Sequence, residues 1–310
     1  MNNLLIIGKK RSLKRRILKN WRLYLLLVPV MAYFVIFKYF PMYGLTLAFK
    51  EYDPRNPFFG GEFVGWKYFL RFFNTYGSWK IITNTLILSI YGILAGFPVP
   101  IILSLLLNEV KNVRFKKFIQ TVTCAPHFIS TVVFVSMLLM FLNPNTGIIN
   151  IIRVKLGLPS IYFMSLPAYF RTIYVVSGIW KNAGWGCIVY MAALSSVDPE
   201  LYEAGAIDGM NKLHKMYHID FKAILPTICI MLILSAGDVM SIGFDKIFLM
   251  QNSLNNSISN VISLYVYNAG LLSGNFSIAT AVGIFNSVVC FIVLLSVNLT
   301  VKRMGGKSLW

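Results

Sequence analysis

Five side chains that could bind a polar solute occur inside long apolar stretches. They are Trp180, Lys181, Asn182, Trp185 and Asp238. Aromatic faces pack against the apolar faces of sugar rings, and Lys and Asn can hydrogen-bond hydroxyls or carboxylates. Charges in hydrocarbon are costly, so they usually have a function or a partner. The pattern predicts a substrate site; in the alternatives, Lys181 faces a partner subunit or pairs structurally with Asp238.

Other titratable residues favour simpler interpretations. Asp245 and Lys246 follow Asp238 and are interpreted as gate or interface residues near the outer surface. His214 and His218 have the i, i+4 spacing of metal ligands, but no third ligand is near them, so we expect no metal site. His127 follows a proline inside an apolar run, which is typical of a hydrogen-bonded residue at a helix kink.

The chain lacks the common motifs of enzymes that bind nucleotides or hydrolyse bonds. It has no GxSxG and no HExxH sequence. The nearest match to a phosphate-binding loop is Gly306-Lys307-Ser308, but Val301 stands where that motif needs its first glycine. We therefore expect no catalytic residues and no cofactor in this chain, and any ATP-derived energy must come from separate subunits.

The composition indicates a membrane protein. Of the 310 residues, 57% are hydrophobic and 13% charged, against about 25% charged in a soluble domain. The net charge is +18, but the basic residues flank apolar runs, which favours membrane lipid over nucleic acid as the surrounding partner. The four cysteines lie in apolar runs without a CxxC pair, which favours simple packing.

The apolar runs predict an all-α, polytopic protein with about six transmembrane helices, because backbone polar groups in lipid must be satisfied within each segment. The expected spans are 23–49, 81–107, 118–142, 172–197, 223–244 and 276–301. An uncharged stretch from 247 to 301 is long enough for two spans, but its six asparagines between 251 and 275 favour a loop. Residues 261–272 would then form a short helix on the outer surface.

Charge placement predicts the orientation. Residues 1–22 hold eight Lys or Arg and no acid, and they precede an apolar run that no small-residue cleavage site follows. With six spans, the tail 302–310 lies on the same side as this basic N-terminus. The positive-inside rule then places both termini in the cytoplasm and divides the chain into a basic segment 1–22, a transmembrane domain 23–301 and a tail 302–310.

The loop 198–222 carries the most specific pattern. Asp198 before Pro199 is a good helix start, Gly209 can turn the chain, and Asn211 can cap a second short helix. Between them, Ala204, Gly205 and Ala206 present little side chain, so a partner surface could approach closely. The loop is predicted to be two short helices at an angle, able to transmit a rigid-body push.

This loop resembles the EAA loop of ABC importer permeases. The matching residues are Glu203, Ala204, Gly205, Asp208, Gly209 and Ile219. The sequences PHFIS at 126–130, NPNTGIIN at 143–150, GIWKNAGW at 178–185 and SAGDVMSIGFDKIFLMQNS at 235–253, with the terminal SLW, are similar to the multi-sugar branch for polysaccharide or aldouronate uptake. The loop departs from the family at Gly205, usually alanine, and at Phe221-Lys222, usually Leu-Pro.

The resemblance implies a type I ABC importer permease in a bacterial cytoplasmic membrane. Such a subunit pairs with a second, related permease, docks two cytoplasmic ATPases that bind ATP and magnesium, and receives cargo from an extracytoplasmic solute-binding lipoprotein. The implied function is alternating-access import of an oligosaccharide, with acidic, uronate-containing ones as candidates. The alternatives are an ion-coupled secondary transporter, for which Asp238 and Asp245 offer little support, and an intramembrane hydrolase, which lacks its motifs.

Overall fold

The structure, a computed structural model, describes residues 20–56 and 60–309. Over these ranges the only extended pairing is an isolated antiparallel bridge between Lys50 and Phe63, so the expected all-α class is confirmed. Most of the expected basic N-terminal segment, residues 1–19, lies outside the described residues.

In the first half of the chain the helices are α2 (Trp21–Phe34), η1 (Val35–Tyr39), η2 (Phe40–Phe49), α3 (Lys67–Asn74), α4 (Ser78–Gly96), α5 (Pro98–Asn108), α6 (Val113–Cys124), η3 (Ala125–Phe128), α7 (Thr131–Phe141), α8 (Ile148–Lys155) and η4 (Phe163–Ser165).

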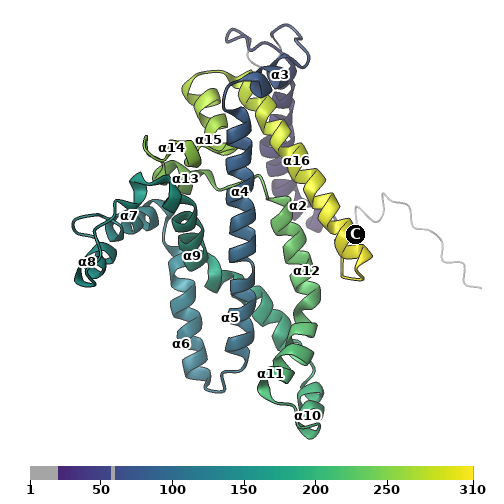
Figure 1. Ribbon diagram of the computed structural model, residues 1–310. Helices are drawn as coiled ribbons and strands as arrows, with labels where there is room; N and C mark the ends of the chain where they lie inside the picture. The colour runs from purple at the N-terminus through teal and green to yellow at the C-terminus, as the bar shows by residue number, and fades with distance from the viewer. Residues whose placement is uncertain (1–19, 57–59, 310) are drawn as a thin grey trace, which may run out of the picture.

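The second half contains the longest helices and the loop with the specific motif. Its helices are α9 (Pro167–Ser195), α10 (Pro199–Ile207), α11 (Lys212–Lys215), η5 (Met216–Phe221), α12 (Lys222–Gly237), α13 (Phe244–Met250), α14 (Asn256–Ser259), α15 (Ile262–Tyr267), η6 (Asn268–Leu272) and α16 (Phe276–Arg303). In Figure 1, α3 and α15 lie at one end of the molecule and α10 and α11 at the other.

The expected count of six spans is not confirmed. Among the described residues, four helical stretches are long and apolar enough to cross a membrane: Trp21–Phe49, Ser78–Asn108, Lys212–Gly237 and Phe276–Arg303. A fifth appears if two helices joined by a sharp bend are counted as one span. The helix α9 has 29 residues, which is long enough, but it is less apolar than these four.

The span expected at 118–142 is broken near its middle. The helical stretches Val113–Phe128 and Thr131–Phe141 meet at 101°. Pro126 has no N–H to continue the helical ladder, and the Ser130 hydroxyl accepts a hydrogen bond from the Val133 N–H (3.4 Å), which caps a new helix. The chain therefore turns here instead of continuing straight.

The span expected at 223–244 also ends early. The helix α12 stops at Gly237, Asp238 forms its C-terminal cap, and a turn leads to α13 at Phe244. Glycines at 237 and 243 bracket this turn, and glycine is a weak helix former. Asp238 consequently lies at a helix end and not inside a span, which corrects the expectation.

The segment expected as a short helix on the outer surface, 261–272, is helical, as α15 and η6; it packs partly into the core, while Leu271 and Leu272 at its end are exposed. Ile262 and Leu264 are buried in the core. The Thr85 hydroxyl of α4 accepts a hydrogen bond from the Ile262 N–H (3.0 Å), which fixes the start of α15. The helix therefore belongs to the packed bundle.

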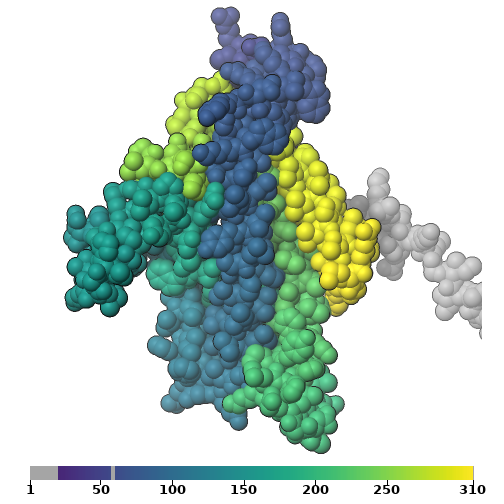
Figure 2. Space-filling model, viewed as in Figure 1, coloured from purple at the N-terminus to yellow at the C-terminus, as the bar shows by residue number. Residues whose placement is uncertain are grey.

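A central rod organises the rest of the molecule. The helices α4 and α5 follow one another with only Phe97 between them and run along most of the molecule, and α9 packs against both (Figure 1). The helix α6 crosses α9 at Gly184, where a Cβ atom would lie 2.3 Å from the Thr123 carbonyl. Glycine is required at this crossing because any side chain would push the two backbones apart. Figure 2 shows α7 and α8 projecting from the side of this bundle.

Candidate functional site

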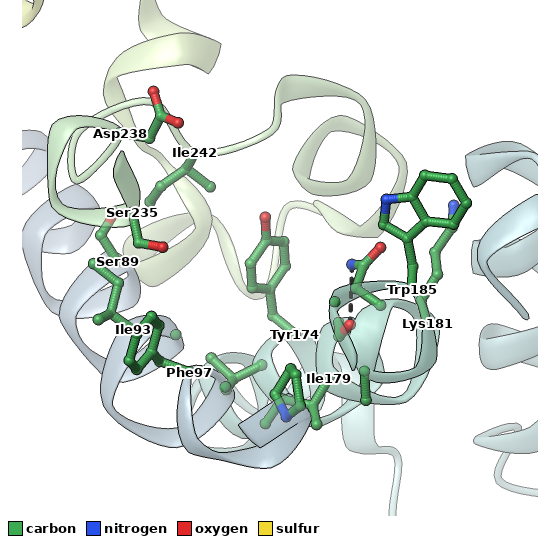
Figure 3. A pocket seen from close by; sticks show the side chains of 18 of the residues that line it. Ser89, Ile93, Phe97, Tyr174, Ile179, Lys181, Trp185, Ser235, Asp238 and Ile242 are labelled. Carbon is green, nitrogen blue, oxygen red and sulfur yellow. Dashed lines mark hydrogen bonds between the residues drawn. The ribbon is translucent and has the colours of Figure 1, made fainter. Parts of the chain in front are cut away.

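A cavity of about 590 Å³ lies between α4, α5, α9, α12 and α13. Four of the five residues predicted to bind substrate line it: Lys181, Asn182, Trp185 and Asp238. Figure 3 shows Lys181 and Trp185 on one side of the cavity and Asp238 with Ser235 on the opposite side. The fifth residue, Trp180, is not part of the lining; its ring packs on Phe134 with centroids 5.4 Å apart.

Lys181 is not paired with Asp238. Its Nζ donates a hydrogen bond to the Thr131 hydroxyl (3.2 Å) and lies 5.2 Å from the centre of the Phe134 ring. Within residues 20–56 and 60–309, no carboxylate lies within ion-pair distance of Lys181. The alternative of a structural Lys181–Asp238 pair is therefore wrong for this conformation.

A second cation, Lys246, enters the same cavity from α13. Its Nζ donates to the Tyr174 carbonyl (2.6 Å) and lies 4.4 Å from the Tyr174 ring centre and 5.8 Å from that of Phe134. A Cβ at Gly178 would lie 3.2 Å from this Nζ, so the glycine leaves room for it. Lys246, interpreted from the sequence as a gate or interface residue, thus lines the cavity.

The two lysines and Asp238 give the cavity an excess of positive charge. Like Lys181, Lys246 has no carboxylate partner among the residues that the structure describes. The rings of Phe134 and Tyr174 attract a cation electrostatically, but they do not neutralise it. An anionic group entering the cavity would supply the missing partner in surroundings where such contacts are stronger than in water.

The bend between α6 and α7 places His127 against two residues of the cavity lining, Asn182 and Trp185. The ring of His127 stacks on Trp185 with centroids 4.6 Å apart, and its Nδ1 lies 3.1 Å from Asn182 Oδ1. Because the Asn182 amide already donates to the Gly178 carbonyl (3.1 Å), its oxygen is the acceptor and His127 Nδ1 the donor. His127 is thus the hydrogen-bonded kink residue that the sequence predicted, and it also supports two cavity residues.

The loop 198–222 starts two helices where the sequence predicted them, but only α10 is short: the second helical stretch, from Lys212, continues through α12 to Gly237. Asp198 accepts a hydrogen bond from the Glu200 N–H (3.0 Å) at the start of α10, and Asn211 accepts one from the His214 N–H (2.8 Å) at the start of α11. Gly209 has φ +70°, a conformation that favours glycine. The loop therefore ends one helix and starts the next within a few residues.

The loop exposes a surface at the end of the molecule opposite α3 (Figure 1). Glu203, Ala204, Asp208 and Gly209 are exposed, and Ile207 is 87% exposed. Gly205 is buried, and a Cβ there would lie 3.1 Å from Met210 Sδ and 3.2 Å from the Ile219 side chain. Of the six motif residues, Gly205 and Ile219 thus pack the loop, and the other four face outward.

The departure at Phe221-Lys222 lies inside a continuous helical stretch. It runs from Lys212 to Gly237, contains Pro226, and includes η5 as a π-helical segment. His214 and His218 lie on it, exposed, with His218 Nδ1 3.1 Å from the His214 carbonyl. No group of three metal-ligating side chains occurs in the described part of the chain.

Comparison with known proteins decides the family. The profile of the binding-protein-dependent transport system inner membrane component matches residues 96–306. This chain belongs to that family of permeases. A polygalacturonan/rhamnogalacturonan transport system permease protein, YteP, of Bacillus subtilis (strain 168) is 40% identical over 308 residues, covering 98% of this chain and 96% of the relative.

Two solved structures resemble the permease closely. One is a bacterial ABC transporter involved in the import of the acidic polysaccharide alginate, with TM-score 0.87, 38% identity and coverage of 94% of this chain and 99% of the other. The second is a bacterial alginate ABC transporter in complex with an alginate pentasaccharide-bound periplasmic protein, with TM-score 0.89, 37% identity and coverage of 96% and 100%. The permease is therefore a membrane transport subunit of the ABC importer type and not itself an enzyme, which favours the importer over the ion-coupled transporter.

Proposed function

We propose that this permease imports an acidic oligosaccharide through the cavity between α4, α5, α9, α12 and α13. The observation that carries the proposal is the pair Lys181 and Lys246, which flank the Phe134 ring and have no carboxylate within ion-pair distance in the described ranges. Transport systems for acidic polysaccharides among the similar proteins, one for alginate and one for polygalacturonan, support the same class of cargo.

Each wall of the cavity has a role in this proposal. The lysines bind carboxylates of the cargo, Trp185 packs against a sugar face, and Asn182 offers hydrogen bonds to hydroxyls. Asp238, on the opposite side (Figure 3), accepts hydrogen bonds from hydroxyls and disfavours an anion at that position. A chain of sugars with one acidic group near α9 would satisfy both sides.

The proposed machinery is a complex of several subunits. The permease pairs with a second, related permease, and two cytoplasmic ATPases dock on loop 198–222 through Glu203, Ala204, Asp208 and Gly209. An extracytoplasmic solute-binding lipoprotein delivers the cargo, and both termini of the permease lie in the cytoplasm. ATP and magnesium bind to the ATPases, and closure of the ATPases moves the loop and alternates access to the cavity.

The test uses the whole complex in proteoliposomes with its binding protein. Uptake of an oligogalacturonate of three or four sugars is compared with uptake of an uncharged oligosaccharide of equal length. The proposal expects ATP-dependent uptake that favours the acidic sugar roughly tenfold or more, as one well-placed charged contact provides. Equal uptake of the two sugars, or uptake without ATP, would contradict it.

A further inference from the structure

A buried carboxylate joins three helices at the end of the molecule that carries loop 198–222. Asp220, on η5, has no solvent exposure. Its Oδ1 accepts hydrogen bonds from the Tyr202 hydroxyl of α10 (2.6 Å) and the Asn108 amide of α5 (3.2 Å), whereas Oδ2 has no partner among the residues that the structure describes. A buried carboxylate with an unpartnered oxygen is destabilising, and an apolar side chain would fill the space at lower cost.

A second polar contact joins the same elements. Lys215 Nζ lies 2.6 Å from Glu109 Oε1, just after α5, and 5.4 Å from the centre of the Tyr202 ring. The loop is thus tied to the end of α5 twice, once through Asp220 and once through Lys215. We call this group the polar junction; its members are Asn108, Glu109, Tyr202, Lys215 and Asp220.

Tyr202 is a stable donor in the polar junction. Burial, together with its hydrogen bond to the Asp220 carboxylate, raises the pKa of Tyr202 to about 12. Its hydroxyl therefore stays protonated at physiological pH and keeps donating to Asp220. Because the tyrosine lies next to Glu203 in the loop motif, this bond connects α10 to Asp220 on η5, and the Asn108–Asp220 bond continues the connection to the end of α5.

The helix α5 leads from the polar junction to the cavity. Phe97 and Pro100 line the cavity at its start, and Asn108 belongs to the polar junction at its end. The helix has 11 residues, roughly 16 Å of rigid rod at about 1.5 Å a residue. Loop 198–222 therefore reaches the cavity by three routes: through α9 before it, through η5 and α12 after it, and through the polar junction and α5.

Asp220 also lies in the π-helical segment η5, directly before Phe221-Lys222. Segments of this kind frequently occur at functional sites. The side-chain contacts of the polar junction hold this segment against the end of α5. Asn108 and Tyr202 supply the two hydrogen bonds to Asp220, so the contact depends on both side chains.

We propose that Asp220, held by Tyr202 and Asn108, is a positioning residue that transmits movement of loop 198–222 onto α5 and so to the cavity wall, by a route separate from α9 and α12. The inference rests on the proposed docking of the ATPases at this loop. When the hydrogen bonds to Asp220 are removed, ATP should still move α12, but the α5 side of the cavity should no longer move with the loop.

The experiment compares the α5 and α12 routes in the assembled complex. A single cysteine is placed in a chain whose four native cysteines are replaced by alanine, either Phe97→Cys directly before α5 or Ser235→Cys on α12, both in the cavity lining. The rate of labelling with N-ethylmaleimide is measured with and without Mg-ATP and vanadate. Tyr202→Phe and Asn108→Leu each remove one hydrogen bond to Asp220. Tyr217→Phe, an exposed tyrosine of η5, is the matched control.

The inference expects ATP to change the labelling rate at both cysteines in the parent chain. Tyr202→Phe and Asn108→Leu should reduce that change roughly tenfold at Phe97→Cys, as loss of a hydrogen bond to a charged group predicts, and leave it within about twofold at Ser235→Cys. Tyr217→Phe should alter neither. Co-purification of the ATPase subunits shows that the complex stays assembled.

Four results would overturn the inference. An unchanged response at Phe97→Cys in both junction variants means that the polar junction does not transmit movement to α5. A response in the parent at Ser235→Cys but not at Phe97→Cys means that α5 does not move, and the proposed coupling by the loop survives. Loss of the response at both cysteines in the junction variants means that α5 has no separate route. Absence of a response at both cysteines in the parent chain contradicts the α5 route and the proposed coupling by the loop as well.

Discussion

The imidazole of His127 lies flat on the indole of Trp185, with ring centroids 4.6 Å apart and planes within 3°. His127 belongs to η3, inside the bend that breaks an expected span, and Trp185 belongs to α9. The bend therefore brings a residue from a different helix against the cavity wall. It fixes the indole that the proposed function places against a sugar ring.

This contact predicts the effect of His127→Ala. A stacked pair of rings contributes about 0.5–1.5 kcal/mol, so the concentration for half-maximal uptake should rise roughly 2- to 12-fold for acidic and uncharged oligosaccharides alike. Trp79→Ala changes an exposed aromatic residue outside the cavity and is the control. An effect confined to the acidic sugar would show that His127 acts through charge instead.

The loop 198–222 gives a prediction about coupling. Glu203→Arg reverses a charge on the exposed face of α10, and Gly209→Pro cannot adopt the observed φ of +70°, since proline holds φ near −65°. Each variant should leave the permease in the membrane but abolish cargo-stimulated ATP hydrolysis, which is measured on the reconstituted complex. Glu62→Arg, an exposed acid elsewhere, is the control. Normal transport by both loop variants would rule out this loop as the docking element.

The crossing of α6 and α9 gives a prediction about stability. At Gly184 a Cβ would lie 2.3 Å from backbone atoms of Thr123, so Gly184→Ala must separate two helices. Overpacking of this kind costs about 1–3 kcal/mol, and the Tm of the purified permease should fall. Gly283→Ala on α16 meets nothing within 4 Å and should leave the Tm unchanged or raise it. Equal melting of the two variants would show that the crossing relaxes easily.

The proposed orientation predicts which residues are reachable from outside the cell. In a cysteine-free chain, a membrane-impermeant maleimide added outside should label Ser253→Cys and miss Leu213→Cys and Lys307→Cys. Ser253 and Leu213 are both exposed in the structure, so access to them reports the side of the membrane and not burial. External labelling at Leu213→Cys would reverse the orientation.

Local signals in the sequence predicted the loop well. Asp198 and Asn211 cap their helices and Gly209 makes the turn, because capping and left-handed turns depend on residues within a few positions of each other. The expected spans were less accurate at Pro126 and Gly237. Hydrophobicity alone does not show that Ser130 caps a new helix or that α12 ends before Asp238.

The sequence did not reveal contacts between segments that are far apart in the chain. Lys246 reaches the Tyr174 carbonyl across 72 positions, and Asn108 reaches Asp220 across 112. Neither pairing leaves a spacing pattern in the sequence. One signal was available for Lys246: the uncharged stretch from 247 to 301 begins directly after it, so this lysine is one of the few charges near an otherwise apolar region.

The central claim is that Lys181 and Lys246 select an acidic cargo. The measurement is the ratio of uptake of oligogalacturonate to uptake of an uncharged oligosaccharide of equal length, for Lys181→Met, Lys246→Met and the charge-preserving Lys181→Arg. Each Met variant should lower the ratio roughly tenfold, since a hydrogen-bonded charge contributes about 1.5–3 kcal/mol, and Lys181→Arg should retain most of it. An unchanged ratio in both Met variants, with the complex intact, would contradict the account.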